Sequence, residues 1–167
     1  MKTLVVYYSL SGNTKRVAEY LKEKMKADLL EVKPVKEFPN KGFKKFFWGG
    51  KSAVIKETPK LEKYSFNPDK YDLIVIASPI WAGRITPPIR TFIVDNKEKL
   101  KTKKIAAIVS SGGGESPKTF PKLKELLEID SFVDTIGVVD LNNKKSVDNK
   151  KNIEIFIKNI SISKEKW

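Results

Sequence analysis

The sequence of 167 residues predicts a single α/β domain, spanning residues 1–167, in which helices cover both faces of a five-stranded parallel sheet. Short, almost wholly apolar runs alternate five times with stretches whose apolar residues recur at helical spacing. Such runs are typical of strands buried on both faces. Right-handed crossovers between these units predict a doubly wound sheet with strand order 2-1-3-4-5.

The first half of the chain opens with the clearest strand and helix pair. Residues 4–8 are apolar and aromatic, and a helix should follow from Thr14, because the apolar residues after it fall on one stripe. Residues 28–32 predict the second strand. Residues 43–56 mix aromatic residues with lysines and predict a helix that a pair of glycines interrupts or ends.

The second half repeats the alternation three times. Strands are predicted at residues 71–77, 104–109 and 132–141. One helix should begin at Pro87 with Thr86 as its cap, and another should begin at Ser116 and Pro117. Residues 153–160 carry the apolar stripe of a last helix.

Composition excludes several kinds of chemistry. The chain has no cysteine and no histidine, so thiolate metal sites, Ser-His-Asp triads and imidazole bases are excluded, and no metal site is expected. Redox chemistry would therefore need a bound redox centre. No apolar stretch approaches the ~20 residues of a membrane span, and no signal peptide precedes the first strand, so we expect a cytoplasmic protein.

The charge is strongly positive. Lysine and arginine exceed aspartate and glutamate by 33 to 20, a net charge of +13. Such an excess attracts nucleic acid, anionic membranes or phosphorylated ligands. Only three of the cations are arginines, which argues against a nucleic-acid partner, and most lysines are expected on solvated helix faces.

The loop after the first strand has the composition of a phosphate site. Ser9, Ser11, Gly12, Asn13 and Thr14 place three hydroxyls, an amide and a glycine before a helix N-terminus. Free backbone N–H groups and the positive end of the helix dipole meet there, so a phosphate fits without any lysine. The simpler alternative is that Ser11 or Asn13 only caps the helix.

Two further loops should meet this one, because the carboxyl ends of neighbouring parallel strands lie at one edge of a sheet. They are residues 78–84 and 110–115. Trp81 offers an aromatic face there for a ligand or partner, and the alternative is burial against the following helix. Gly83 and the glycines at 112–114 allow a close backbone approach.

These loops carry a resemblance to a known family. S-L-S-G-N-T after the first strand resembles the FMN phosphate loop of flavodoxins, usually [ST]-x-T-G-N-T, with Ser11 keeping the hydroxyl where threonine is common. S-P-I-W-A-G-R-I-T-P-P-I-R resembles the second flavin loop of short flavodoxin-like proteins. With the five-fold alternation, the resemblance covers essentially the whole chain.

The resemblance implies FMN as the cofactor and the flavin, rather than any side chain, as the reactive centre. Its phosphate would be held by Ser9, Ser11, Gly12, Asn13 and Thr14. Its isoalloxazine ring would be wrapped by Pro79, Ile80, Trp81, Ala82, Gly83, Ser110, Ser111, Gly112, Gly113 and Gly114.

The implied function is electron transfer to a redox partner protein, with two alternatives. Many flavodoxins are acidic, whereas this chain is basic, and a positive surround stabilises reduced, negatively charged flavin. The first alternative is therefore an NAD(P)H-dependent FMN reductase of quinones or flavins, with Arg84 pairing with a substrate phosphate or carboxylate or simply covering the neighbouring helix. The second is a non-redox module that binds a phosphate ligand or nucleic acid. The aromatic residues at 46–48 or the last helix could form a homodimer contact.

Overall fold

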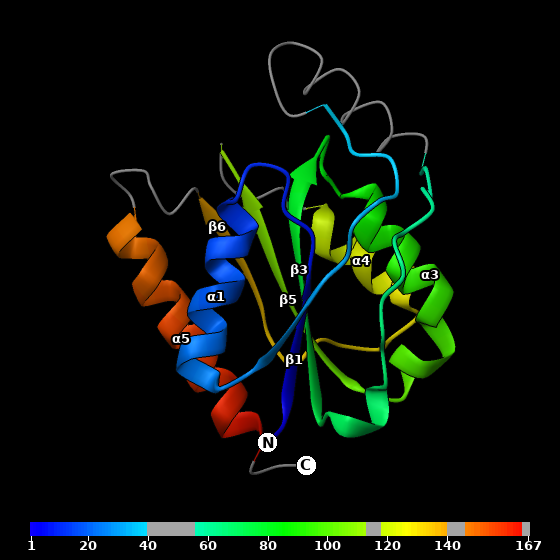
Figure 1. Ribbon diagram of the computed structural model, residues 1–167. Helices are drawn as coiled ribbons and strands as arrows, with labels where there is room; N and C mark the ends of the chain where they lie inside the picture. Colours follow the sequence, from blue (N-terminus) through cyan, green and yellow to red (C-terminus); the bar gives the residue numbers. More distant parts are fainter. Residues whose placement is uncertain (40–55, 113–117, 140–145, 165–167) are drawn as a thin grey trace.

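The computed structural model describes residues 1–39, 56–112, 118–139 and 146–164. Parallel strands form a central sheet in the order β2-β1-β3-β5-β6 (Figure 1). These strands are β1 (Thr3–Tyr7), β2 (Asp28–Glu31), β3 (Leu73–Trp81), β5 (Lys104–Ser111) and β6 (Thr135–Val139). Since β4 is a short extra strand outside this path, the order confirms the predicted 2-1-3-4-5 topology of a flavodoxin-like sheet.

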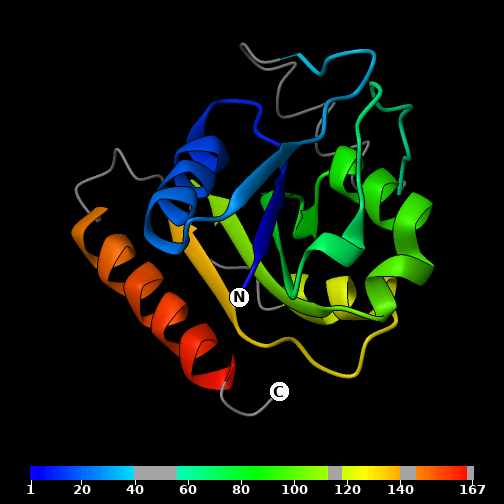
Figure 2. The same ribbon diagram turned by 60° about the horizontal axis from the view of Figure 1, so that its bottom comes forward.

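Helices cover both faces of the sheet. Helices α1 (Asn13–Met25) and α5 (Ser146–Lys164) lie on one face, and α3 (Pro87–Lys101) and α4 (Thr119–Leu127) lie on the other, as two views agree (Figure 1 and Figure 2). A 3-10 helix, η1 (Pro68–Lys70), leads into β3. In the part of the chain that the structure describes, every helix is too short or too polar to span a bilayer.

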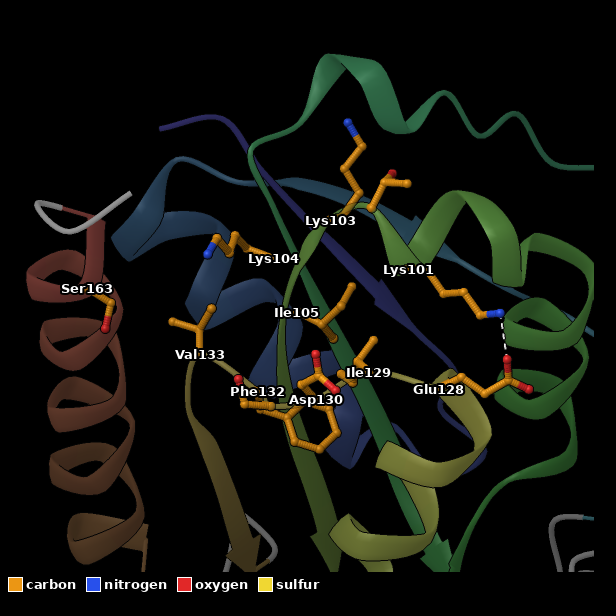
Figure 3. A pocket seen from close by; sticks show the side chains of 12 residues that line it. Lys101, Lys103, Lys104, Ile105, Glu128, Ile129, Asp130, Phe132, Val133 and Ser163 are labelled. Atoms are coloured by element: carbon orange, nitrogen blue, oxygen red, sulfur yellow. Dashed lines mark ion pairs between the residues drawn. The ribbon is translucent and has the colours of Figure 1, made fainter.

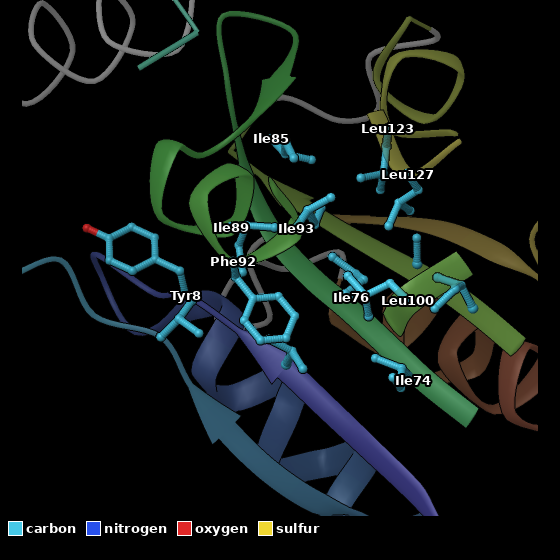
Figure 4. Close-up of a cluster of buried hydrophobic side chains, with 14 of the residues drawn as sticks. Tyr8, Ile74, Ile76, Ile85, Ile89, Phe92, Ile93, Leu100, Leu123 and Leu127 are labelled. Carbon is cyan, nitrogen blue, oxygen red and sulfur yellow. The ribbon is translucent and has the colours of Figure 1, made fainter. Parts of the chain in front are cut away.

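Alternate residues of the strands feed two apolar layers. Ile74 and Ile76 of β3 pack with Phe92 under α3 and α4, and Figure 4 shows this layer. Val75, between them in the chain, packs under α1 and α5. This period of two is what a strand buried on both faces requires, and it fixes the register of the sheet.

The end of β3 departs from the prediction. Residues 78–84 were expected as a loop, but β3 continues to Trp81 and then pairs with the antiparallel strand β4 (Arg84–Ile85). The two turn residues, Ala82 and Gly83, have φ values of 48° and 68°. Positive φ at both positions is the geometry of a tight two-residue hairpin, which Asn-Gly or Asp-Gly normally indicates in a sequence. Because this turn is Ala-Gly, the sequence did not predict it.

Two other expectations are corrected. Thr86 occupies the N-cap position of α3, but its side chain makes no capping hydrogen bond. Its hydroxyl lies 3.1 Å from that of the buried Ser78, which needs partners inside the core. The fifth predicted strand is shorter than expected, because Phe132 packs against the core ahead of β6 instead of joining the sheet.

Some predicted features lie outside the described residues. They are the helix at 43–56 apart from Lys56, the helix start at Ser116 and Pro117, residues 140–141 of the fifth predicted strand, and the site residues Gly113 and Gly114.

Candidate functional site

A pocket of about 310 Å³ opens at the carboxyl ends of β1, β3 and β5. Its volume falls in the ~300–1,000 Å³ range of small-molecule sites. It is lined by Ser9, Ser11, Asn13, Thr14, Pro79, Ile80, Trp81, Ala82, Ser110, Ser111 and Gly112. The three loops singled out in the sequence therefore come together around one cavity.

A larger hollow of about 660 Å³ lies at the opposite end of the sheet (Figure 3). Lys101 there pairs with Glu128 and with Glu98, and Lys103 pairs with Asp69. These two cations are already neutralised, and the hollow borders the amino end of β5. Doubly wound sheets bind ligands at the carboxyl ends of their strands, so we take the smaller pocket as the candidate site.

The start of α1 presents its backbone amides to this pocket without a side-chain cap. Gly12 is the N-cap residue, with φ 89° in the left-handed region, and within the described residues no side chain makes a capping hydrogen bond there. The alternative in which Ser11 or Asn13 only caps the helix therefore does not occur. No acidic residue lies in the first turn, so the positive end of the helix dipole stays uncompensated.

Hydroxyl groups line the same end of the pocket. Thr14 is 1% exposed, and its Oγ1 lies 2.8 Å from Oγ of Ser110, which ties the first loop to the end of β5. Oγ of Ser9 is buried and has no hydrogen-bond partner within the described chain. An unpaired buried polar atom costs ~1–3 kcal/mol, and a ligand oxygen in the pocket would remove that cost.

Arg16 lies beside the first loop of the candidate site, although the sequence analysis gave it no role there. A Cβ built on Gly12 would lie 3.4 Å from Nη1 of Arg16, and Nε of Arg16 is buried without a hydrogen-bond partner in the described residues. Helical side chains lean toward the N-terminus, so a residue four positions after the loop glycine reaches back over the loop. The i, i+4 spacing from Gly12 to Arg16 is therefore the sequence feature that could have predicted this position for Arg16.

Trp81 lines the pocket, packs against the core cluster that includes residues of α3, and contacts two aromatic rings. Its ring centroid lies 6.0 Å from that of Tyr8 and 5.2 Å from that of Phe38, both edge-on. Tyr8 is 1% exposed, and its burial raises the pKa of its hydroxyl, with the charges of Glu37 and Glu31 adding to the effect. Tyr8 therefore remains protonated at neutral pH, and its ring packs edge-on against Trp81.

Three predicted residues stand beside the cavity rather than in its lining. Gly12 and Gly83 form the turns that shape two of the loops. Arg84 lies in β4, opposite Trp81 across the hairpin.

Comparison with known proteins identifies the family. The sequence profile of a family described as flavodoxin matches residues 2–153. The chain belongs to the flavodoxin family. This match confirms the resemblance found in the first loop and the strand pattern. Among curated protein sequences, no significant match is found.

Solved structures of the flavodoxin fold resemble this family member over most of its length. A flavoprotein from Lactobacillus acidophilus NCFM, crystallised in complex with FMN, is 29% identical, with a TM-score of 0.68 over 89% of this chain and 97% of that chain. A protein from Bacteroides eggerthii DSM 20697 is 23% identical, with a TM-score of 0.71 over 91% and 96%. Two-electron reduced flavodoxin from Megasphaera elsdenii is 19% identical, with a TM-score of 0.54 over 83% and 85%.

Proposed function

We propose that this flavodoxin-family protein binds FMN in the pocket at the carboxyl ends of β1, β3 and β5 and serves in electron transfer. The observation that carries the proposal is the uncapped N-terminus of α1, which faces a pocket lined by hydroxyls. The 29% identical flavoprotein from Lactobacillus acidophilus, solved with FMN, supports the choice of ligand.

The phosphate of FMN would bind at the loop before α1. The amides of the first helical turn donate there, and the left-handed Gly12 lets the main chain approach closely. Ser9 would donate its otherwise unpartnered hydroxyl to a phosphate oxygen. Arg16 would supply a full positive charge at this end, since its guanidinium lies over Gly12.

The ring of FMN would lie between the β3–β4 hairpin and the end of β5. Trp81 gives an aromatic wall, and Ala82 and Gly112 leave backbone exposed to a ligand. The bound flavin supplies the redox centre that a chain without cysteine lacks. The protein's own contribution is to hold, orient and shield it.

Flavin titration of the FMN-free chain tests the binding. Quenching of flavin fluorescence should be saturable with FMN. Riboflavin, which lacks the phosphate, should bind at least about tenfold more weakly, because it loses at least one charge-assisted hydrogen bond. Ser9→Ala should weaken FMN binding without lowering the stability of the FMN-free chain, because it removes an unpaired buried atom. Ser131→Ala, an exposed serine at the opposite end of the sheet, is the control.

Absence of FMN uptake would leave only the non-redox phosphate-binding or nucleic-acid alternative.

The reductase alternative uses the same flavin site as the electron carrier. The two differ in their electron donor, which is NADH or NADPH for the reductase and a partner protein for the carrier. Anaerobic mixing of the FMN-loaded protein with NADH or NADPH should leave the flavin absorption unchanged for a carrier that depends on a partner protein, whereas rapid bleaching would favour the reductase.

A further inference from the structure

A cluster of cations borders the candidate flavin site on the side of α4. We name this cluster the β4–α4 cation patch and define it by Arg84, Arg90, Lys118 and Lys122. Arg84 directly follows the hairpin turn whose Ala82 lines the pocket. Within the described part of the chain, none of the four takes part in an ion pair.

Packing of the core brings these residues together. Ile85, next to Arg84, belongs to the same buried cluster as Leu123, next to Lys122, and Figure 4 shows both side chains between β4 and α4. Arg90 lies one turn into α3, where its amide donates to the carbonyl oxygen of Thr86 at 3.0 Å. Helices α3 and α4 pack against each other on this face.

The electrostatics of the patch are unfavourable without an anion. Both helices present their N-termini here, neither has an acidic residue in its first turn, and no described side chain caps either of them. Lys118 occupies the N-cap position of α4, where a cation opposes the helix dipole. Arg84 and Lys122 are half-buried, which weakens the screening of their mutual repulsion.

The pKa directions agree with this crowding. The pKa of Lys122 is lowered by burial and then by the charges of Arg84, Lys118 and Lys56. Burial and the charge of Arg84 lower the pKa of Arg90.

A buried hydroxyl at the head of α4 adds an independent observation. Thr119, the first residue of α4, is 1% exposed, and its Oγ1 has no hydrogen-bond partner within the described residues. A buried donor without a partner, at the N-terminus of the helix that carries Lys118 and Lys122, is the arrangement that a phosphate oxygen satisfies.

We propose that the β4–α4 cation patch, beside the flavin pocket, is an anion site that takes the phosphate or pyrophosphate group of a small molecule. Two arginines offer planar donors for paired phosphate oxygens, and Thr119 with the α4 amides offers neutral ones. A compact anion fits better than a broad acidic protein surface, because three of the four cations are half-buried. The site rests on its own residues and does not require that FMN be bound.

Amide chemical shifts of the full, FMN-loaded chain, titrated with inorganic pyrophosphate, test the site. We expect saturable shifts at Arg84, Thr119 and Lys122, with little change in the loop before α1. Arg84→Gln should weaken pyrophosphate binding about tenfold, the cost of one charge-assisted contact. Lys151→Gln, on an exposed position of α5, should change it less than twofold.

Thr119→Val separates a binding role from a structural one. It should keep the shape of the buried side chain and stabilise the anion-free chain, while weakening pyrophosphate binding. Small, non-saturating shifts spread over lysines of the whole surface would overturn the proposal. Saturable binding of poly-glutamate at the patch without binding of pyrophosphate would also overturn it and indicate an acidic protein partner.

If the chain takes up no FMN, the same shifts are followed in the FMN-free protein. Saturation at the patch would then uphold the anion site while the proposed flavin function fails.

Discussion

Oγ1 of Thr14 lies 2.8 Å from Oγ of Ser110, although the two residues are 96 positions apart in the chain. Both side chains are buried, and the bond joins the first turn of α1 to the end of β5. It therefore holds two of the three loops of the candidate site at a fixed separation. Preorganisation of this kind is what precise cofactor binding needs.

Thr14→Val should remove this bond while keeping the shape of the side chain. Because Ser110 would be left as an unpaired buried hydroxyl, we expect a loss of ~1–3 kcal/mol in the free energy of unfolding. Urea denaturation of the FMN-free chain measures it. Ser163→Ala removes an exposed hydroxyl that bonds the Asn159 carbonyl and should change stability by less than ~0.5 kcal/mol. Equal losses in both variants would show that the buried bond has no special role.

Gly12 and Gly112 form a matched pair for testing backbone strain. Gly12 has φ 89°, and an added Cβ would meet Arg16, whereas a Cβ on Gly112 would meet nothing within 4 Å. Gly12→Ala should lower the free energy of unfolding by ~1–2 kcal/mol, the cost of a left-handed non-glycine residue. Gly112→Ala should be close to neutral. Thermal unfolding of the FMN-free chains compares them, and similar losses in the two variants would contradict the assignment of strain to Gly12.

Glu128 gives the protein a predictable loss of stability in acid. It pairs with Lys97 and Lys101, and these hydrogen bonds lower the pKa of its carboxyl to about 2. A lowered pKa in the folded state means that the stabilisation is fully present above the unfolded value of about 4.5 and is lost as the pH falls through about 2. The window is therefore pH 4.5 to 2.

Glu128→Gln should accordingly destabilise the protein at pH 7 and lose most of this effect as the pH falls to about 2. Urea denaturation at several pH values checks this. Glu125→Gln, which removes an exposed carboxylate of the same helix, is the control. A Glu128→Gln defect that persists unchanged at pH 2 would mean that the ion pairs are not its cause.

The strand order, and the meeting of the three site segments at one edge of the sheet, were predictable because each rests on local patterns. Apolar runs with a period of two identify the buried strands, and parallel connection then brings their carboxyl ends to one edge. The hypothesis that the first loop binds a phosphate also comes from a local pattern, because five of its six positions are polar or glycine.

The parts that the sequence did not reveal depend on tertiary partners. The hairpin at Ala82 and Gly83 lacks the usual turn residues, so its positive φ values are imposed by the pairing of β4 with β3. Thr86 has the residue type and place of a cap, but a buried Ser78 competes for its hydroxyl. Arg16 was given no role at the site, because only the folded helix start shows that it lies over Gly12.

Arg16 provides the most direct test of how the phosphate end of the site works. If its guanidinium contacts the phosphate, Arg16→Met should weaken FMN binding about tenfold and leave riboflavin binding within about twofold, because only FMN carries the phosphate. The FMN-free variant should be no less stable, since Nε of Arg16 is buried without a partner in the described chain. Flavin fluorescence quenching measures both affinities.

Lys15→Met is the matched control for Arg16→Met. Lys15 is the preceding cation of the same helix and is exposed, so its removal changes the net charge equally without touching the loop. If Lys15→Met weakened FMN binding as much as Arg16→Met, the effect would be one of general charge. If Arg16→Met weakened FMN and riboflavin equally, the arginine would act by shaping the pocket instead of by binding the phosphate. Selective loss of FMN affinity in the Arg16 variant alone requires a direct contact, because long-range attraction is screened beyond about 10 Å at 0.1 M salt.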